Sequence, residues 1–162
     1  MSVEPLRPRH EPTPSNLPRL ATALWTSTAV LVLALAAVIA LNWESVLSGV
    51  ESAVSQQDST ASATDVRNTA SATLLSSGAA SAILVLLGFV ALNLLRGAAT
   101  SSKVLMGAVG ILTIGAAVTF SSFVSDAPAL FGGVLQWGPF VIAAVAAAAT
   151  VVALLPRRPA TR

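Results

Sequence analysis

The stretch that decides the fold runs from Leu20 to Leu41 and reads LATALWTSTAVLVLALAAVIAL. It contains no charged residue. At about 1.5 Å per residue, a helix of this length is roughly 33 Å long, which is enough to cross a hydrocarbon core of about 30 Å. Because backbone N–H and C=O groups inside lipid must find partners within the chain, the stretch is expected to be helical.

Three further apolar stretches follow, over residues 74–95, 104–124 and 134–155, and none contains Asp, Glu, Lys, Arg or His. With the first stretch they predict an all-α integral membrane protein built on a four-helix transmembrane bundle. A cleaved signal peptide is the alternative for the first stretch. However, its apolar run is longer than the 7–15-residue core of such peptides.

The composition agrees with one small membrane domain over residues 20–155. Apolar residues make up 54% of the chain and charged residues 10%, whereas about a quarter of a soluble protein is charged. The first 19 residues form a proline-rich tail that we expect to be disordered and cytoplasmic, and residues 156–162 form a basic cytoplasmic tail. The net charge is only +2, so we expect no nucleic-acid partner, and there are no cysteines to form a disulfide.

The basic residues orient the spans. If the chain crosses the membrane four times, eight of the nine bases fall on one side with two acids, a net charge of +6, and the other side has one base and five acids, a net charge of −4. Loops rich in Lys and Arg stay in the cytoplasm, so both termini are expected to be cytoplasmic and the protein to be multi-pass in the bacterial inner (plasma) membrane. Trp25 is expected near the inner interface, with Trp43 and Trp137 near the outer one. The eight bases are Arg7, Arg9, Arg19, Arg96, Lys103, Arg157, Arg158 and Arg162.

The loop over residues 42–73 is longer than a simple connection needs, and it contains no proline. Three of its valines recur at helical spacing; they are Val46, Val50 and Val54. We therefore expect the first membrane helix to continue to about Ser55 and a second helix to open at Asp65, with Ser62 or Thr64 as its cap. The sequence thus predicts an extracytoplasmic helical hairpin between the first two spans.

Four acidic residues of this loop are spaced seven apart: Glu44, Glu51, Asp58 and Asp65. Since seven residues are nearly two helical turns, acids at this spacing on one helix share a face. They are candidates for a stripe that docks a basic partner. The alternative is a solvated face opposite the valines. The acids are too far apart along the chain to form a calcium loop.

The last apolar stretch is rich in alanine and contains two pairs of small residues spaced four apart. Such spacing lets helices approach closely, which is a main source of attraction between helices in lipid. The pairs serve either internal packing of the bundle or docking on another membrane protein. The candidate docking residues are Ala143, Ala144, Ala147 and Ala148.

Several classes of function lack their usual residues. The one histidine, His10, lies in the proline-rich tail, so no catalytic, metal or cofactor site is predicted. Four-span multidrug exporters depend on a carboxylate inside their first span, and this chain has none there. An oligomeric pore or small transporter stays open as an alternative, although no span carries a clear polar stripe.

The sequence uses Arg far more than Lys and is rich in Ala and Val, a bias typical of GC-rich bacterial genomes. In architecture it resembles small four-span envelope proteins of high-GC actinobacteria, some of which look like accessory subunits of lipid-import or cell-wall machines. The resemblance rests on no motif and assigns no residue. It favours a non-catalytic accessory, scaffold or regulatory subunit in the lipid bilayer. The expected partner is a larger membrane-protein complex, and a homo-oligomer is also open.

Overall fold

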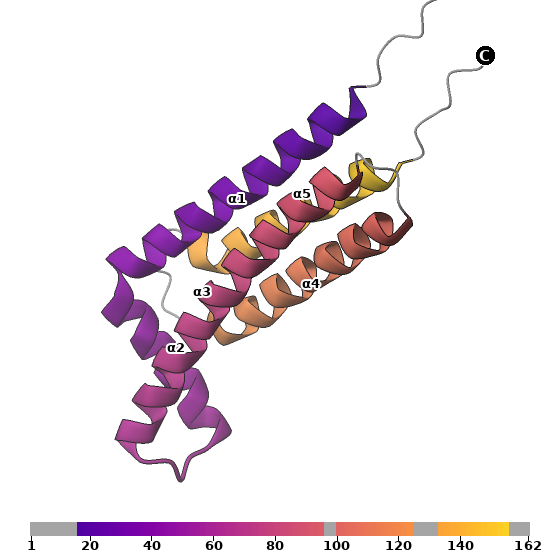
Figure 1. Cartoon of the computed structure of the whole chain (residues 1–162). Helices are drawn as coiled ribbons and strands as arrows, with labels where there is room; N and C mark the ends of the chain where they lie inside the picture. Colours follow the sequence, from indigo (N-terminus) through magenta and orange to yellow (C-terminus); the bar gives the residue numbers. More distant parts are fainter. Residues whose placement is uncertain (1–15, 96–99, 125–132, 156–162) are drawn as a thin grey trace, which may run out of the picture.

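The computed structural model describes residues 16–95, 100–124 and 133–155, and these residues form five helices (Figure 1). They are α1 (Leu17–Leu41), α2 (Trp43–Gln57), α3 (Ala63–Leu94), α4 (Thr100–Val124) and α5 (Val134–Leu154). Four of them, α1, α3, α4 and α5, are long and apolar enough to cross a membrane. An all-α fold with four long apolar helices is therefore confirmed. Most of the predicted first tail and all of the second lie outside the described residues.

The four long helices form a bundle in which each packs against two neighbours. Because α5 packs against α4 and α1, and α3 packs against α4 and α1, the order around the bundle is α1, α5, α4, α3. The contact between α1 and α3 is the smallest of the four. The start of α1 and the end of α5 lie at one end of the bundle, and the turn between α2 and α3 lies at the other, which we call the hairpin end (Figure 1).

The chain breaks its helix at Asn42, between α1 and α2. Asn42 has φ −124° and ψ 31°, and its side-chain Nδ2 donates a hydrogen bond to the Val38 carbonyl at 2.9 Å. Its backbone N–H is shared between the carbonyls of Val38 and Ile39, each at 3.2 Å. A side chain that binds a nearby backbone carbonyl competes with the helix. The prediction of one continuous helix to about Ser55 is therefore wrong, and α2 is a separate helix.

Joined by a turn over residues 58–62, α2 and the first turns of α3 pack against each other (Figure 1). Ser62 caps α3, since its hydroxyl oxygen accepts a hydrogen bond from the Asp65 N–H at 3.2 Å and donates one to the Asp65 carboxylate at 2.7 Å. Of the two predicted caps, Ser62 is the one observed. Val46 and Val50 are buried and Val54 is half-buried, which confirms the predicted apolar face of this segment.

The bundle has two apolar cores, one at each end. The hairpin-end core joins α2 to α3 and α5, and the far-end core joins all four long helices. The hairpin-end core consists of Val46, Leu47, Val50, Ala70, Leu74 and Leu135. The far-end core consists of Trp25, Ala91, Leu95, Met106, Val109, Ala146 and Ala149. Leu35 and Ile39 of α1 also pack against the hairpin-end core.

Trp25 lies in the far-end core. The sequence had instead led us to expect it near the inner membrane interface. Its side chain is fully buried, and Gly88 of α3 provides the room, since a Cβ built on Gly88 would overlap the indole ring. The indole Nε1 donates a hydrogen bond to the Val85 carbonyl at 3.0 Å, which supplies the partner that a buried indole N–H needs. Trp25 therefore holds α1 against α3 at the far end of the bundle.

Candidate functional site: an apolar groove next to the hairpin

A groove with a volume of about 400 Å³ lies between the two cores, on the side of the bundle where α1 and α3 meet. We call it the lateral groove. One wall comes from Val32 to Trp43 of α1 and α2, and the other comes from Leu74 to Val85 of α3. The floor is formed by α4 and α5, with the buried side chains of Thr113, Pro139 and Ile142. All four long helices thus contribute to its surface.

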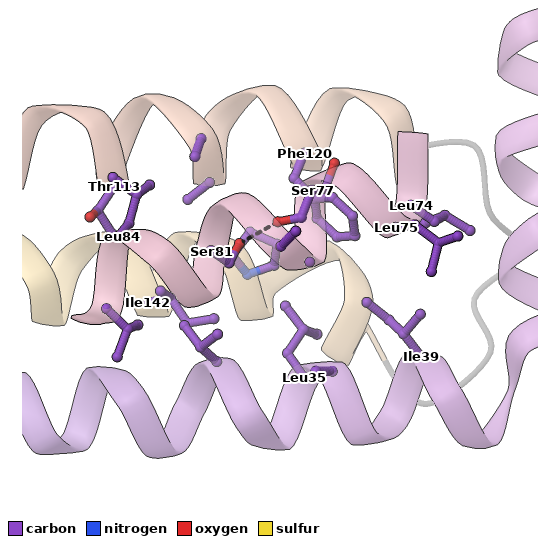
Figure 2. A pocket seen from close by; sticks show the side chains of 18 of the residues that line it. Leu35, Ile39, Leu74, Leu75, Ser77, Ser81, Leu84, Thr113, Phe120 and Ile142 are labelled. Carbon is purple, nitrogen blue, oxygen red and sulfur yellow. Dashed lines mark hydrogen bonds between the residues drawn. The ribbon is translucent and has the colours of Figure 1, made fainter. Parts of the chain in front are cut away.

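The groove lies where a run of small side chains on α3, between larger ones at each end of the wall, faces α1. Residues 76–82 read SSGAASA, and a Cβ built on Gly78 would meet no atom within 4 Å. Figure 2 shows Leu35 and Ile39 reaching from α1 toward Ser77 and Ser81 of α3. One leucine and one isoleucine on α1, facing two serines on α3, cannot fill the space that large side chains on both helices would fill. The contact between α1 and α3, which is the smallest in the bundle, therefore leaves a gap beside residues 76–82 of α3.

The hydroxyl groups that line the groove are already bonded within their own helices. Ser77 donates to the Thr73 carbonyl at 2.7 Å, Ser81 to the Ser77 carbonyl at 2.8 Å and Thr113 to the Val109 carbonyl at 2.8 Å. The bond between Ser81 and Ser77 is drawn in Figure 2. No Asp, Glu, Lys, Arg or His lines the groove. Its surface is therefore apolar in effect, with no hydroxyl donor left for a polar guest.

Trp43 stands at the hairpin end of the groove, as the first residue of α2. Its side chain is half-buried, and its indole N–H makes no hydrogen bond to another of the described residues. Trp25 differs, because its indole N–H is bonded to a backbone carbonyl. Trp43 thus supplies an available donor at one end of an otherwise apolar surface.

The groove is open on its side, between α1 and α3. Five of its lining residues are exposed, two on α1 and three on α3. Both α1 and α3 are long and apolar enough to cross a membrane. The exposed lining residues are Ala36, Ala40, Leu75, Gly78 and Ala79.

The four acidic candidates do not form one stripe. Glu44 and Glu51 share α2 and approach Arg67 of α3, whose Nη2 lies 3.1 Å from Glu44 Oε2 and whose Nη1 lies 3.9 Å from Glu51 Oε1. Asp58 lies in the turn, and Asp65 belongs to the cap of α3. The pKa of the Asp58 carboxyl is held below its ordinary value because it accepts hydrogen bonds from the hydroxyl and the N–H of Thr60. Each of the four acids therefore has a charged or hydrogen-bonded partner within the hairpin, although the buried Glu51 Oε1 accepts no hydrogen bond from the described residues.

The alanine candidates of α5 divide between the inside and the outside of the bundle. Ala143 is buried and Ala147 half-buried, whereas Ala144 and Ala148 are exposed. The tightest alanine packing is made by Ala146 and Ala149, which are fully buried in the far-end core and which the four-residue spacing did not single out. Internal packing and an outward small-residue face are thus both present on this helix.

Neither a metal cluster nor the one histidine contributes to a site in the described part of the chain. No group of three His, Cys, Asp or Glu residues that could hold a metal ion occurs there, and His10 lies outside it.

The sequence did not lead us to predict the lateral groove, although the run of small residues over 76–82 marks its position. No protein-family model, curated protein or solved structure matches this chain.

Proposed function

We propose that the protein is a non-catalytic accessory, scaffold or regulatory subunit of a larger bacterial envelope complex, such as a lipid transporter or a cell-wall assembly. The observation that carries the proposal is the hairpin of α2 and α3, which packs on the hairpin-end core together with α5 and turns charge outward. Val50 is 1% exposed, whereas the Glu44 side chain is 75% exposed. An ordered, charged projection suits docking, because complementary charges steer and orient association.

The proposed location is the bacterial plasma membrane, with the hairpin outside and both termini in the cytoplasm. A helix of the length of α3 measures about 48 Å, which exceeds a hydrocarbon core of about 30 Å, so one end of it must project. The polar end, with Asp65 and Arg67, is the one that projects most easily. The excess of bases on the opposite side favours the orientation.

Two single cysteines test this orientation in a chain that has no cysteine of its own. Ser59 lies exposed in the hairpin turn, and Ser101 lies exposed at the start of α4. In intact cells, an impermeant thiol reagent should label Ser59→Cys and leave Ser101→Cys unlabelled until the membrane is opened. Labelling of Ser101→Cys alone would reverse the orientation, and labelling of both in intact cells would contradict the cytoplasmic position of Ser101.

Docking is tested by purifying the complex in mild detergent with wild-type protein and variants. Enlarging the outward face of α5 with Ala144→Leu and Ala148→Leu should release larger membrane proteins, because bulk at a small-residue contact separates the helices. Neutralising Glu44, Glu51, Asp58 and Asp65 together to Gln or Asn should weaken retention and leave the bundle folded. Exposed ion pairs are worth only about 0–1 kcal/mol each, and Asn keeps the capping of the turn.

The matched control is Ala34→Leu with Ala37→Leu, an exposed alanine pair on α1. If this pair releases the partner as completely as the α5 pair, α5 is not the docking face. The alternative function is an oligomeric pore or a small transporter, for which the lateral groove offers a surface that could bind an apolar solute. Wild-type protein that retains no larger protein and moves a solute across liposomes would establish that alternative and refute docking.

A further inference from the structure

The length of the lateral groove matches the depth of one lipid leaflet. Its walls extend over Val32 to Trp43 and over Leu74 to Val85. At about 1.5 Å per residue, each wall is roughly 16 Å long. Half of a hydrocarbon core of about 30 Å is about 15 Å. A groove at the hairpin end of the bundle therefore covers the leaflet on the hairpin side and ends near the middle of the membrane.

The surface of the groove selects hydrocarbon over a polar or charged guest. Its serine and threonine hydroxyls donate to their own helices, and no ionisable side chain lines it. A polar guest would lose its hydrogen bonds to water and find few in exchange, which is costly. Side chains that face a void also lose dispersion contacts. A flexible apolar chain satisfies both conditions at once.

The open side of the groove decides where such a chain comes from. Its mouth lies between two helices that are apolar enough to cross a membrane, and it is bordered by exposed small residues such as Ala36, Ala40 and Gly78. Around these helices the neighbouring molecules are lipids, so a lipid tail reaches the groove without crossing a polar barrier. At the hairpin end, the half-buried Trp43 presents an indole N–H with no partner among the described residues. This is the level at which a lipid headgroup begins, and a Trp N–H there is a donor for it.

We propose that one acyl chain of a membrane phospholipid occupies the lateral groove, entering sideways between α1 and α3. The indole N–H of Trp43 donates a hydrogen bond to an ester or phosphate oxygen of the same lipid. The bound chain completes the packing between the hairpin-end core and the far-end core. The proposal rests on the membrane insertion of the four helices. It does not depend on docking to a complex or on which side of the membrane the hairpin lies.

The test blocks the groove and leaves the helices intact. Gly78→Leu places a large side chain at the mouth of the groove, where a Cβ meets no atom within 4 Å. Gly115→Leu is the matched control, because Gly115 also has open space around its Cβ but lies on an exposed position of α4 outside the groove. Native mass spectrometry of protein purified in mild detergent should detect one retained phospholipid on wild type and on Gly115→Leu. Gly78→Leu should lower the lipid-bound fraction about tenfold or more.

A phospholipid with a photoreactive group on its acyl chain gives an independent readout in liposomes. Cross-links should concentrate in the peptides that line the groove, over residues 32–43 and 74–85, and Gly78→Leu should abolish that concentration. Equal lipid retention by wild type, Gly78→Leu and Gly115→Leu overturns the proposal, as do cross-links spread evenly over exposed residues of α4. A dimer that only Gly78→Leu dissociates would show that a second copy fills the groove, which also overturns it. None of these outcomes depends on whether a larger complex is retained.

Discussion

Replacing Gly88 with alanine should lower the free energy of unfolding by about 3 kcal/mol, the upper part of the usual range for an overpacked core. The added methyl group would overlap the indole of Trp25, which is fully buried and bonded to the Val85 carbonyl. Either α1 moves away from α3 or the ring leaves its site, and both outcomes break the far-end core. The change is measured by unfolding in mixed micelles, with helicity as the signal.

Gly115→Ala is the control for this substitution, because a Cβ at Gly115 meets no atom within 4 Å. It should be neutral or slightly stabilising, since alanine is the better helix former. A smaller partner should rescue part of the loss: Trp25→Leu in the Gly88→Ala background should be less destabilising than the sum of the two single changes. Equal stability of Gly88→Ala and Gly115→Ala would contradict the packing of Trp25 on Gly88.

Val50→Pro should unfold α2 and cost about 3 kcal/mol or more. Proline removes a backbone donor from the interior of a helix and clashes with the preceding turn. Val50 also belongs to the hairpin-end core and is 1% exposed, so its packing against α3 is lost as well. Amide hydrogen exchange should rise across residues 46–55 and across the start of α3, while α1, α4, α5 and the rest of α3 stay protected.

Val50→Ala separates the two contributions, because it removes the side chain and keeps the backbone donor. We expect it to be clearly milder than Val50→Pro and to preserve exchange protection along α2. Exchange in the wild type as fast as in an unstructured peptide over residues 46–55 would show that α2 is not a stable helix. The same result would remove the ordered projection on which the docking proposal depends.

The sequence predicted the elements of the bundle because its signals are local and strong. Long apolar stretches without a charged residue have few alternatives to a helix in lipid, and four such helices are present. The valine spacing and the Ser62 cap also act within a few residues of the chain. Patterns of this kind can be read from the sequence without knowing which helices are neighbours.

The features that the sequence did not predict depend on contacts between helices or on a choice between local hydrogen bonds. The break at Asn42 depends on its amide binding the Val38 carbonyl, which another rotamer would not do. The burial of Trp25 depends on Gly88, which lies on another helix. The lateral groove arises where a run of small residues on α3 faces α1, and this requires the order of the helices around the bundle.

The positions of the candidate docking residues also depend on contacts between helices, which the sequence does not show. Acids at a spacing of seven form a stripe only if one helix carries them all, and the turn over residues 58–62 divides them between α2, the turn and α3. The position of Arg67 between Glu44 and Glu51 follows from the packing of α2 on α3. Whether an alanine of α5 faces inward or outward likewise depends on where its neighbours α1 and α4 lie.

The positions of the three tryptophans give the protein a built-in set of optical reporters. The chain has no tyrosine, so its near-ultraviolet fluorescence comes from three indoles in different surroundings. Trp25 is fully buried in the far-end core, Trp43 is half-buried beside the groove and Trp137 of α5 is 64% exposed. Variants that keep one tryptophan and replace the other two with Phe would report separately on the core, the groove and the outer surface. Quenchers dissolved in water or attached to lipid tails would then locate each region without any added label.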